Sequence, residues 1–404
     1  MYRGHRVGGD AAVTGGFMKH IWSCLLVALA AIVTGVPAHA DASVSARWTK
    51  AQANAWYAKQ PWPVGSNYVP SDAINELEMW QAATFDPKRI DQELGWAQSL
   101  GMNTMRVFLH DLLWKQDPAG FKKRINAFLV IAAKHHIKPI FVLFDSCWDP
   151  DPKLGPQHPP IPGVHNSGWV QSPGIAMDDP SQYPRFEHYV KDIVGSFAKD
   201  DRILAWDVWN EPDNPGGGNY TDHEPKDKFQ RVAELLPQVF TWARSEHPTQ
   251  PLTSGLWHDD DWSPSAHLNA IERTQVEQSD IISFHNYGWP EDFLRRVDQL
   301  KSYGRPMICT EYMARGAGST IDGVLPIGKR LNVGMVNWGF VNGKTQTDLP
   351  WDSWQRPYTE QPPTIWFHDL LHADGTPYRE REAQIIRVLS HSPKGVVPAS
   401  ALSP

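Results

Sequence analysis

An α/β fold, closed into a (β/α)8 TIM barrel, is the architecture that the sequence predicts. Short apolar runs rich in strand-forming residues alternate along the chain with longer stretches that suit helices. Strands that alternate with helices form parallel sheets, and eight such pairs within about 330 residues indicate a closed barrel. A doubly wound open sheet is the alternative, but no glycine-rich phosphate-binding fingerprint follows the first strand.

The predicted elements follow one another from the N-terminal side to the C-terminal side. Strands are expected near 64–68, 104–109, 139–144, 203–209, 252–257, 281–286, 306–311 and 333–338. After a helical lead-in over 47–59, helices are expected near 87–100, 121–135, 183–198, 227–244, 264–274, 290–302, 320–330 and 377–389. Two long loops remain, over 145–180 and 341–364, together with a glycine-rich loop over 213–223.

The N-terminal region has the features of an export signal. A basic start at Met18-Lys19-His20 precedes an apolar run and a small-residue cleavage site, Ala38-His39-Ala40. The apolar run is too short for a confident membrane span. We therefore expect an upstream extension over 1–17, a signal peptide over 18–40, and a secreted or periplasmic protein. A single domain over 41–392 and a flexible tail over 393–404 would follow.

Composition restricts the partners of the chain. The 404 residues carry a net charge of −7, which favours neither nucleic acid nor an anionic membrane as a partner. Tryptophan is abundant, with 19 residues, and suits either core filling or stacking on the flat faces of sugar rings. Outside the signal only Cys147 and Cys309 remain. A disulfide could form between them after export, but the predicted strands on which they lie are not neighbours. We expect a monomer.

The residues whose side chains could bind or react with a substrate lie at the ends of the predicted strands. In a barrel the C-terminal ends of all strands converge on one mouth. Those ends supply Arg106, His110, Asp145, Trp148, Asn210, Glu211, Trp257, His258, His285, Tyr287, Glu311 and Trp338. Pro212 stops the fourth strand, so Glu211 stands where that strand becomes a loop. Glu311 ends the seventh strand.

The two glutamates should face each other across the mouth. Strands four and seven of an eight-stranded barrel lie about 14 Å apart, and each glutamate reaches inward by about 4.5 Å. About 5 Å then separates the carboxyl groups, which is the spacing of a retaining glycosidase, whereas an inverting enzyme needs a wider gap for its water.

These residues also resemble a known family. Trp209-Asn210-Glu211-Pro212, Glu311, Arg106, His285-Asn286-Tyr287 and Trp338 are similar to the motifs of clan A glycoside hydrolases, and most of all of family 5, the cellulase- and mannanase-type retaining β-glycosidases. The resemblance covers nearly the whole mature chain. It implies hydrolysis of β-linked O-glycosidic bonds in oligo- or polysaccharides by double displacement, with no cofactor and no metal.

The resemblance also implies roles for individual residues. Glu211 would be the acid/base and Glu311 the nucleophile. Among the substrate-binding residues, Asn210 would contact the sugar 2-hydroxyl, Arg106 and Tyr287 would hold the nucleophile, and Trp338 would lie under the reacting sugar. His285 belongs to the same set. Trp148 joins it as a loop tryptophan that either stacks on sugar or packs the loop, and the same two readings apply to Trp169, Trp351 and Trp354.

Some features depart from the family or leave alternatives open. Tyr312-Met313 follow Glu311 where family 5 enzymes often have glycine, and Asp145-Ser146-Cys147-Trp148 stand where a histidine is expected. Both leave the substrate class open. The two long loops could close the cleft into a pocket, which would favour attack at chain ends.

Three other functions are alternatives to a glycoside hydrolase. A non-catalytic carbohydrate-binding barrel would not need two opposed glutamates, and a transglycosylase would use the same residues as a hydrolase. A metal-dependent barrel hydrolase would need His-x-His or a comparable cluster on the strands, and His-x-His does not occur in the chain. For His110 and His258 a structural role is expected.

Overall fold

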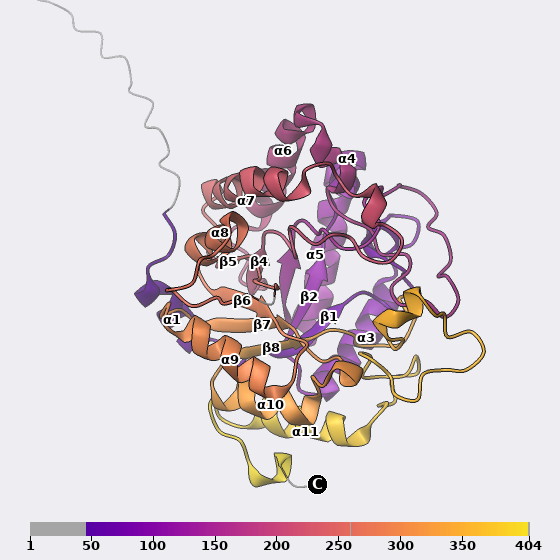
Figure 1. Ribbon diagram of the computed structural model, residues 1–404, viewed down its shortest axis with the longest axis vertical. Helices are drawn as coiled ribbons and strands as arrows, with labels where there is room; N and C mark the ends of the chain where they lie inside the picture. Colours follow the sequence, from indigo (N-terminus) through magenta and orange to yellow (C-terminus); the bar gives the residue numbers. More distant parts are fainter. Residues whose placement is uncertain (1–45, 259, 403–404) are drawn as a thin grey trace, which may run out of the picture. The chain divides into compact units, whose positions relative to one another are not determined.

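The structure, a computed structural model, describes residues 46–258 and 260–402. Its centre is a sheet of eight parallel strands in the order β5-β4-β3-β2-β1-β8-β7-β6, and Figure 1 shows these strands in the middle with helices around them. The strands are β1 (Val64–Tyr68), β2 (Thr104–Phe108), β3 (Lys138–Val142), β4 (Ala205–Asp207), β5 (Leu252–Thr253), β6 (Ile282–His285), β7 (Met307–Glu311) and β8 (Gly334–Asn337). The predicted (β/α)8 barrel is confirmed.

The barrel closes between β5 and β6 through a single bridge. Leu256 and Phe284 form this parallel bridge. The Leu256 amide donates to the Ser283 carbonyl at 3.1 Å, and the His285 amide donates to the Leu256 carbonyl at 2.8 Å. These bonds continue the hydrogen-bonding pattern around the ring, so the mouth is bounded on all sides.

The helices surround the strands as the sequence indicates. They are α1 (Lys50–Lys59), α2 (Glu76–Trp80), α3 (Pro87–Ser99), α4 (Asp111–Gln116), α5 (Pro118–Lys134), α6 (Tyr183–Phe197), α7 (Lys228–Ser245), α8 (Ala270–Gln278), α9 (Pro290–Lys301), α10 (Ile321–Arg330) and α11 (Glu380–His391). Short 3-10 helices are η1 (Gly174–Asp178), η2 (Pro180–Gln182), η3 (Thr221–His223), η4 (Arg315–Ala317), η5 (Trp351–Trp354) and η6 (Ala399–Ala401). The sequence prediction did not include α2 and α4, because five or six residues are too few to establish a helical period.

Several predicted boundaries differ from those of the structure, and two of them illustrate why. The helix expected over 264–274 begins later, because Asn269 caps α8 and forms a capping box with Glu272. The strand expected over 203–209 pairs as a ladder only over Ala205–Asp207. The Val208 amide still donates to the Thr253 carbonyl at 2.8 Å, so the chain keeps its strand direction up to Asn210 and Glu211.

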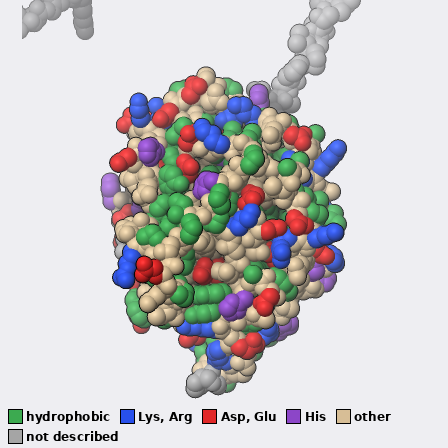
Figure 2. All heavy atoms as spheres, turned by 90° about the vertical axis from the view of Figure 1, so that its right-hand side faces the viewer, with side chains coloured by type: hydrophobic (Ala, Val, Ile, Leu, Met, Phe, Trp, Pro, Cys, Tyr) green, Lys and Arg blue, Asp and Glu red, His purple; other side chains and the backbone are tan. Residues whose placement is uncertain are grey.

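Several predictions concern the ends and the surface of the chain. The predicted extension over 1–17 and signal over 18–40 lie outside the described residues. Within the part of the chain that the structure describes, no helix combines the length and apolar character needed to cross a membrane. The tail predicted over 393–404 contains η6, where Ala401 is buried and its carbonyl accepts from Arg381 at 3.1 Å. On the face shown in Figure 2, basic and acidic side chains are interspersed.

Candidate active site

Glu211 is presented by a strained turn at the end of β4. Its φ of 38° lies in the left-handed region, which non-glycine residues seldom adopt. The Asn214 amide donates to the Glu211 carbonyl at 2.9 Å and closes the turn. The residue is 9% exposed, so it stands at the inner wall of the mouth and not in bulk water.

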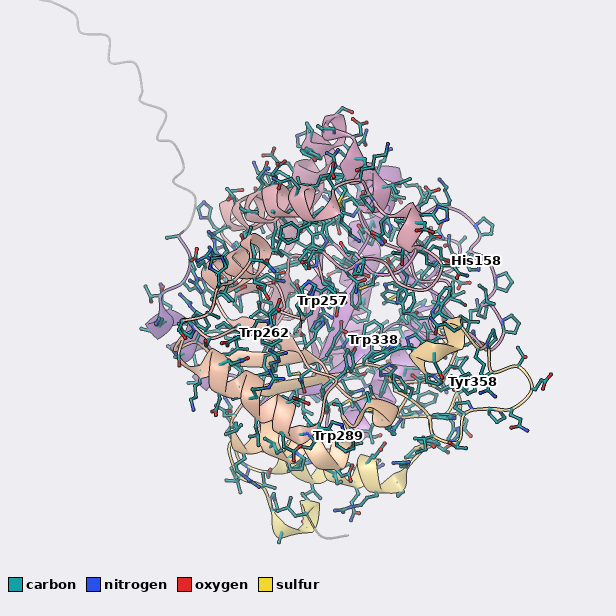
Figure 3. All side chains as sticks on the ribbon, in the orientation of Figure 1. His158, Trp257, Trp262, Trp289, Trp338 and Tyr358 are labelled. Carbon is teal, nitrogen blue, oxygen red and sulfur yellow. The ribbon has the colours of Figure 1, made fainter. Side chains whose placement is uncertain are left out.

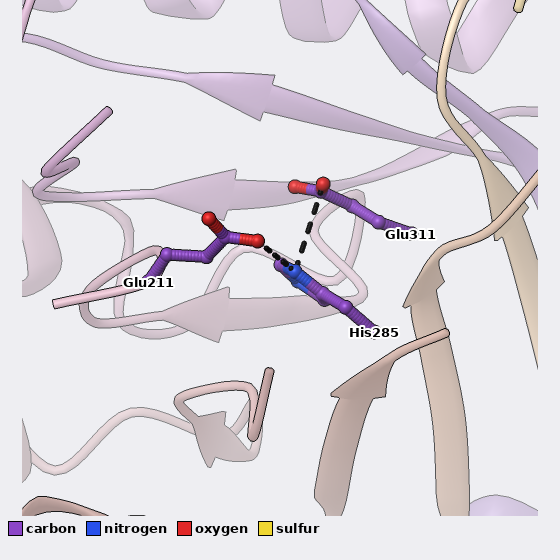
Figure 4. A group of neighbouring side chains, drawn as sticks. All are labelled: Glu211, His285 and Glu311. Carbon is purple, nitrogen blue, oxygen red and sulfur yellow. Dashed lines mark hydrogen bonds and ion pairs between the residues drawn. The ribbon is translucent and has the colours of Figure 1, made fainter. Parts of the chain in front are cut away.

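Both oxygens of the Glu211 carboxyl group have partners. Oε1 lies 2.7 Å from His285 Nδ1, as Figure 4 shows. Oε2 accepts from Asn214 Nδ2 at 2.6 Å and from the Cys147 thiol at 3.4 Å. None of these partners carries a fixed positive charge, so this carboxyl group can hold a proton.

Glu311, the last residue of β7, has a different environment. Arg106 Nη1 donates to Oε1 at 2.7 Å, and the Tyr287 hydroxyl donates to Oε2 at 2.7 Å. His285 Nδ1 lies 3.6 Å from the same Oε2. A register shift between Phe284 and His285 places His285 opposite Glu311 on the neighbouring strand. A guanidinium group and a phenol together favour the carboxylate form.

The two glutamates and His285 converge on one point. Their nearest nitrogen and oxygen atoms all lie within 4.8 Å of one another. This agrees with the spacing of about 5 Å that the barrel geometry predicts. The same three side chains also form the one set among the described residues that could hold a metal ion.

Arg106 is the centre of the polar network below the glutamates. It is fully buried and bonds to Asp207 Oδ2 through Nε at 3.1 Å and Nη2 at 2.8 Å. Nη2 also donates to Asn210 Oδ1 at 2.6 Å, and Nη1 donates to Asn67 Oδ1 at 2.9 Å. One guanidinium group thus fixes Glu311 and the amide next to Glu211. Fixed geometry of this kind is what a preorganised site requires.

Burial shifts the ionisation of the main groups. It raises the pKa of Glu211, against the hydrogen bonds from Asn214 and Cys147. It also raises the pKa of Glu311, against the charge of Arg106 and the hydroxyl of Tyr287. Because only Glu311 contacts a cation, we expect Glu311 to lose its proton first. Burial lowers the pKa of His285 to about 4, so its ring is neutral at pH 7.

A cavity of about 300 Å³ opens above the glutamates. We call it the main cavity. Its lining includes Asp145, Cys147, Trp148, His165, Asn166, Trp169, Asn210, Glu211, Tyr287, Glu311, Trp338 and Trp351. The ring of Trp338 is held edge-on by Phe108 at 6.0 Å and by Trp169 at 5.8 Å. Figure 3 shows Trp338 and Trp257 lying over the barrel centre. Such an indole-lined space suits a sugar ring.

The two long loops are joined to each other beside this cavity. The Asn166 amide donates to the Thr345 carbonyl at 2.8 Å, and the His165 amide donates to Ser353 Oγ at 2.9 Å. Trp148 stacks on Trp354 with centroids 5.1 Å apart and planes 14° apart. One face of the Trp148 ring is thus used for packing between the two loops. The residue also lines the main cavity.

A second space, the side cavity, lies on the other side of Glu211. Its volume is about 270 Å³, and its lining consists of Glu211, Trp257, Trp262, His285, Asn286, Tyr287, Gly288, Asp292 and Arg296. Glu211, Trp257 and Tyr287 belong to both cavities. Glu211 therefore stands between two spaces, while Glu311 lines only the main cavity.

The structure adds residues that the sequence prediction did not include. Asp207 holds Arg106, and Asp213 accepts from Trp257 Nε1 at 2.8 Å. Asn214 and Cys147 contact Glu211 directly. Three of these four residues lie close in sequence to the Asn-Glu-Pro motif. That nearness is the one feature of the sequence that points to them as site residues. The role of each residue depends on which strand lies opposite to it. The local sequence around the residue does not show which strand that is.

Other sequence expectations can be compared with the structure. His110 accepts from the Leu112 amide at 3.1 Å and bonds the Gln171 carbonyl at 3.1 Å, which is a structural role. His258 contacts Asp213 at 2.9 Å. Cys147 and Cys309 are free thiols. Met313, the second residue after Glu311, has a φ of 77°, a conformation that favours glycine.

Fold and geometry together define a (β/α)8 barrel with two carboxyl groups at the C-terminal ends of its strands. A scan of the sequence against protein-family models finds no match. No curated protein matches either. Comparisons of the structure do find similar folds.

The chain is similar to a GH5_18 protein from Streptomyces cattleya solved with Manβ1-4GlcNAc, with a TM-score of 0.56, 14% identity and 82% of each chain covered. It is also similar to the exo-β-1,4-mannosidase Op5Man5 from Opitutaceae bacterium strain TAV5, with a TM-score of 0.54, 19% identity, and coverage of 85% of this chain and 60% of that one. For the endo-β-1,4-mannanase from Thermotoga petrophila the TM-score is 0.50 at 14% identity, covering 83% and 77%. The fold is thus that of the family 5 glycoside hydrolases, as the resemblance in sequence predicts.

Proposed function

We propose that the protein is a retaining glycoside hydrolase that removes a terminal β-linked sugar, with a β-mannoside as the first candidate substrate. The observation that carries this proposal is the pair Glu211 and Glu311. One carboxyl oxygen of each lies within 4.8 Å of one oxygen of the other, and only Glu311 is paired with a cation. That difference gives the two carboxyl groups the two roles that double displacement needs.

The reaction would proceed in two balanced steps. Ionised Glu311 attacks the anomeric carbon while Glu211 gives its proton to the departing glycosidic oxygen, and a glycosyl–enzyme ester forms. Esterification removes the charge of Glu311, which lowers the affinity of Glu211 for a proton. Glu211 then takes a proton from water, the water oxygen attacks the anomeric carbon, and the ester bond to Glu311 breaks.

The short distance between the carboxyl groups supports retention. Inverting enzymes keep their carboxyl groups about 6.5–9.5 Å apart to admit a water molecule. At 4.8 Å or less between the nearest oxygens, the space between Glu211 and Glu311 suits an anomeric carbon and its bonds.

The joined loops support action at a chain end. Gln346 Nε2 donates to the carbonyls of Ile161 and Val164 at 2.8 and 2.9 Å, and the Tyr358 amide donates to Gly163 at 2.9 Å. These bonds join the two loops that supply His165, Asn166 and Trp351 to the lining of the main cavity. We infer that the joined loops limit how far a sugar chain can extend beyond the cavity. The departing part would lie in the side cavity, next to Glu211.

The sugar preference is supported by the structural neighbours. Two of them are named as a mannosidase and a mannanase, and a third was solved with Manβ1-4GlcNAc. The main cavity presents tryptophan rings and amide groups rather than a cation in front of the sugar, which suits a neutral hexose.

The rival functions are less compatible with the geometry. A metal ion held by Glu211, His285 and Glu311 would lie beside the Arg106 guanidinium, and both oxygens of Glu311 are already hydrogen-bonded. A non-catalytic carbohydrate-binding barrel would not need Glu211 in a strained conformation next to ionised Glu311. Transglycosylation shares every residue and is separated only by product analysis. Export, as residues 18–40 indicate, is part of the proposal.

The test is a panel of aryl β-glycosides and mannooligosaccharides, with the first product resolved by anomeric NMR and chromatography. We expect a terminal sugar released in the β configuration, with activity unchanged by a chelator. Glu311→Gln, which keeps the size of the side chain, is the inactive control. An α product, release of internal fragments, or activity restored by a divalent ion after chelation would contradict the proposal.

A further inference from the structure

Cys147 lies between the two residues at the acid/base end of the site. Its thiol donates to Glu211 Oε2 at 3.4 Å, and its sulfur accepts from Asn210 Nδ2 at 3.5 Å. The residue is half-buried and lines the main cavity. One sulfur atom thus joins the amide and the carboxyl group that flank the place of the proposed reaction.

The thiol of Cys147 stays protonated at neutral pH. Burial raises the pKa of this thiol well above its usual value, and the charges of the nearby carboxyl groups add to the effect. Cys147 also belongs to no disulfide. An S–H group is a weak donor and sulfur is a weak acceptor. Neither contact therefore holds its partner as firmly as an oxygen atom in the same place would.

The Asn210 amide has one loosely held hydrogen as a result. Its Oδ1 accepts from Arg106 Nη2 at 2.6 Å, and its Nδ2 donates to Asp145 Oδ1 at 2.8 Å. The amide nitrogen carries two hydrogens. The second one is directed at Cys147 Sγ, with a longer distance and a poorer acceptor. A hydroxyl oxygen in the main cavity can therefore replace the sulfur as acceptor of this hydrogen.

The hydroxyl group next to the reacting carbon is the one within reach. Arg106 bonds both Asn210 Oδ1 and Glu311 Oε1, so the amide lies beside the carboxylate that attacks the anomeric carbon. The ring carbon bonded to the anomeric carbon is C2. Hydrogen bonds to the 2-hydroxyl strengthen in the transition state of glycoside cleavage. A firm partner for the Asn210 hydrogen would compete with that gain.

On the other side of the sulfur, the same weakness favours the acid form of Glu211. Its Oε2 already accepts from Asn214 Nδ2 at 2.6 Å. A second strong donor on this oxygen would stabilise the carboxylate, whereas the first chemical step needs the protonated acid. The S–H group of Cys147 occupies the position of that donor and donates only weakly.

We propose that Cys147 is a positioning residue whose thiol fills the space between Asn210 and Glu211 with a weakly bonding atom. The sugar 2-hydroxyl can then take the Asn210 hydrogen, and Glu211 keeps its proton for the glycosidic oxygen. The inference rests on the proposed function and adds to it a residue that acts through its two neighbours. An oxygen in place of the sulfur would compete with both atoms of the substrate.

The first experiment replaces the sulfur by oxygen or removes it. With a dinitrophenyl β-mannoside, which needs no acid, Cys147→Ser should lower kcat/KM about tenfold, because its hydroxyl competes for the Asn210 hydrogen. Cys147→Ala has no competing atom and should stay within about threefold of the wild type. The 2-deoxy analogue of the substrate offers no hydroxyl, so the loss caused by serine should largely disappear. Serine as fast as the wild type, or an equal loss on both substrates, would overturn the proposal.

The second experiment uses pH profiles with a poor leaving group, which needs the acid. Serine should stabilise the Glu211 carboxylate and lower its pKa, so the basic limb of kcat/KM moves to lower pH. Alanine removes the thiol donor and should move the same limb to higher pH. Displacements in the same direction, or a limb that stays in place in both variants, would contradict the proposal. The other titratable and charged groups that face Glu211 are unchanged in both variants; they are Arg106, Asp145, Asp213, His285, Tyr287 and Glu311.

Cys309→Ser is the matched control. This thiol is fully buried, lies two residues before Glu311, and donates to the Glu311 carbonyl at 3.3 Å rather than to a reacting side chain. Serine at this position should leave the ratio of the two substrates and the basic limb unchanged. Cys147→Ser should melt no lower than Cys147→Ala, because its hydroxyl has partners. A serine variant that is both less stable and slower on both substrates would make the sulfur a packing atom and refute the proposal.

An infrared measurement separates this inference from the proposed function. The S–H stretch of Cys147, obtained by subtracting the spectrum of Cys147→Ala, should show a weakly hydrogen-bonded thiol at pH 7. That band in a protein that hydrolyses no glycoside would refute only the proposed function. A thiolate, which has no such band, would refute the role of the sulfur.

Discussion

Replacement of Glu211 by alanine separates the two halves of the proposed reaction. The change removes the proton donor for departure and the base for water, while Glu311 keeps its bonds from Arg106 and Tyr287. Positioned acid catalysis contributes about 10²–10⁴-fold. We therefore expect kcat/KM to fall by about that factor for poor leaving groups, such as a second sugar, and to change little for dinitrophenyl glycosides.

The activated substrate should then stop at the covalent intermediate. With no base to activate water, the variant should show a burst of one equivalent of phenol followed by slow turnover. Azide needs no base and can enter through the side cavity of about 270 Å³. It should accelerate turnover and give a β-glycosyl azide. In Glu311→Ala, azide would attack from the face that the nucleophile has left, and the product would be the α-azide.

Stability changes should not confuse this experiment. The alanine variant leaves Asn214 Nδ2 and His285 Nδ1 without their hydrogen-bond partner, which costs about 1–3 kcal/mol. Glu211→Gln keeps the volume and an acceptor oxygen and serves as the matched control, with the same kinetic defect and a smaller loss of stability. An α-azide from the Glu211 variant, or the same anomer from both variants, would show that the roles are assigned wrongly.

Four further outcomes are expected. Tyr287→Phe removes a 2.7 Å bond to the Glu311 carboxylate, so the pKa of Glu311 rises and the acidic limb of kcat/KM should move to higher pH with about a tenfold loss of rate; an unmoved limb would contradict this. Trp338→Ala should lower turnover far more than the melting temperature, because this ring is partly exposed at the cavity rim; an active but much less stable variant would make Trp338 a core residue. Burial raises the pKa of Glu93 from 4.5 to about 7. As the pH rises, the unfolded chain therefore releases this proton before the folded protein does, and the free energy of unfolding should fall by about 3 kcal/mol between those pH values. In denaturant titrations, Glu93→Gln should remove this part of the pH dependence. N-terminal sequencing of exported protein should begin after Ala40, and an intact residue 18 on that protein would exclude cleavage there.

The sequence by itself determined that the fold is a barrel and that the candidate active site lies at the C-terminal ends of its strands. Strand periodicity is local, and the rule that parallel strands place their C-terminal ends at one mouth turns a list of strand ends into a site. Glu211 and Glu311 can therefore be paired across 100 residues of chain, and the sequence alone is enough to estimate their separation. Pro212 and the asparagine before the glutamate marked the end of β4 in the same local way.

Only the tertiary structure decided how these groups are held. The bond from Asp207 to Arg106 and the register shift that sets His285 opposite Glu311 each depend on which atoms of different strands meet. The helix at 264–274 was misplaced because its start depends on the cap at Asn269, not on apolar period. The closure of the long loops likewise arises from contacts between segments that lie far apart in sequence. Local patterns specify where a side chain can point, whereas its partners, burial and pKa are properties of the packed whole.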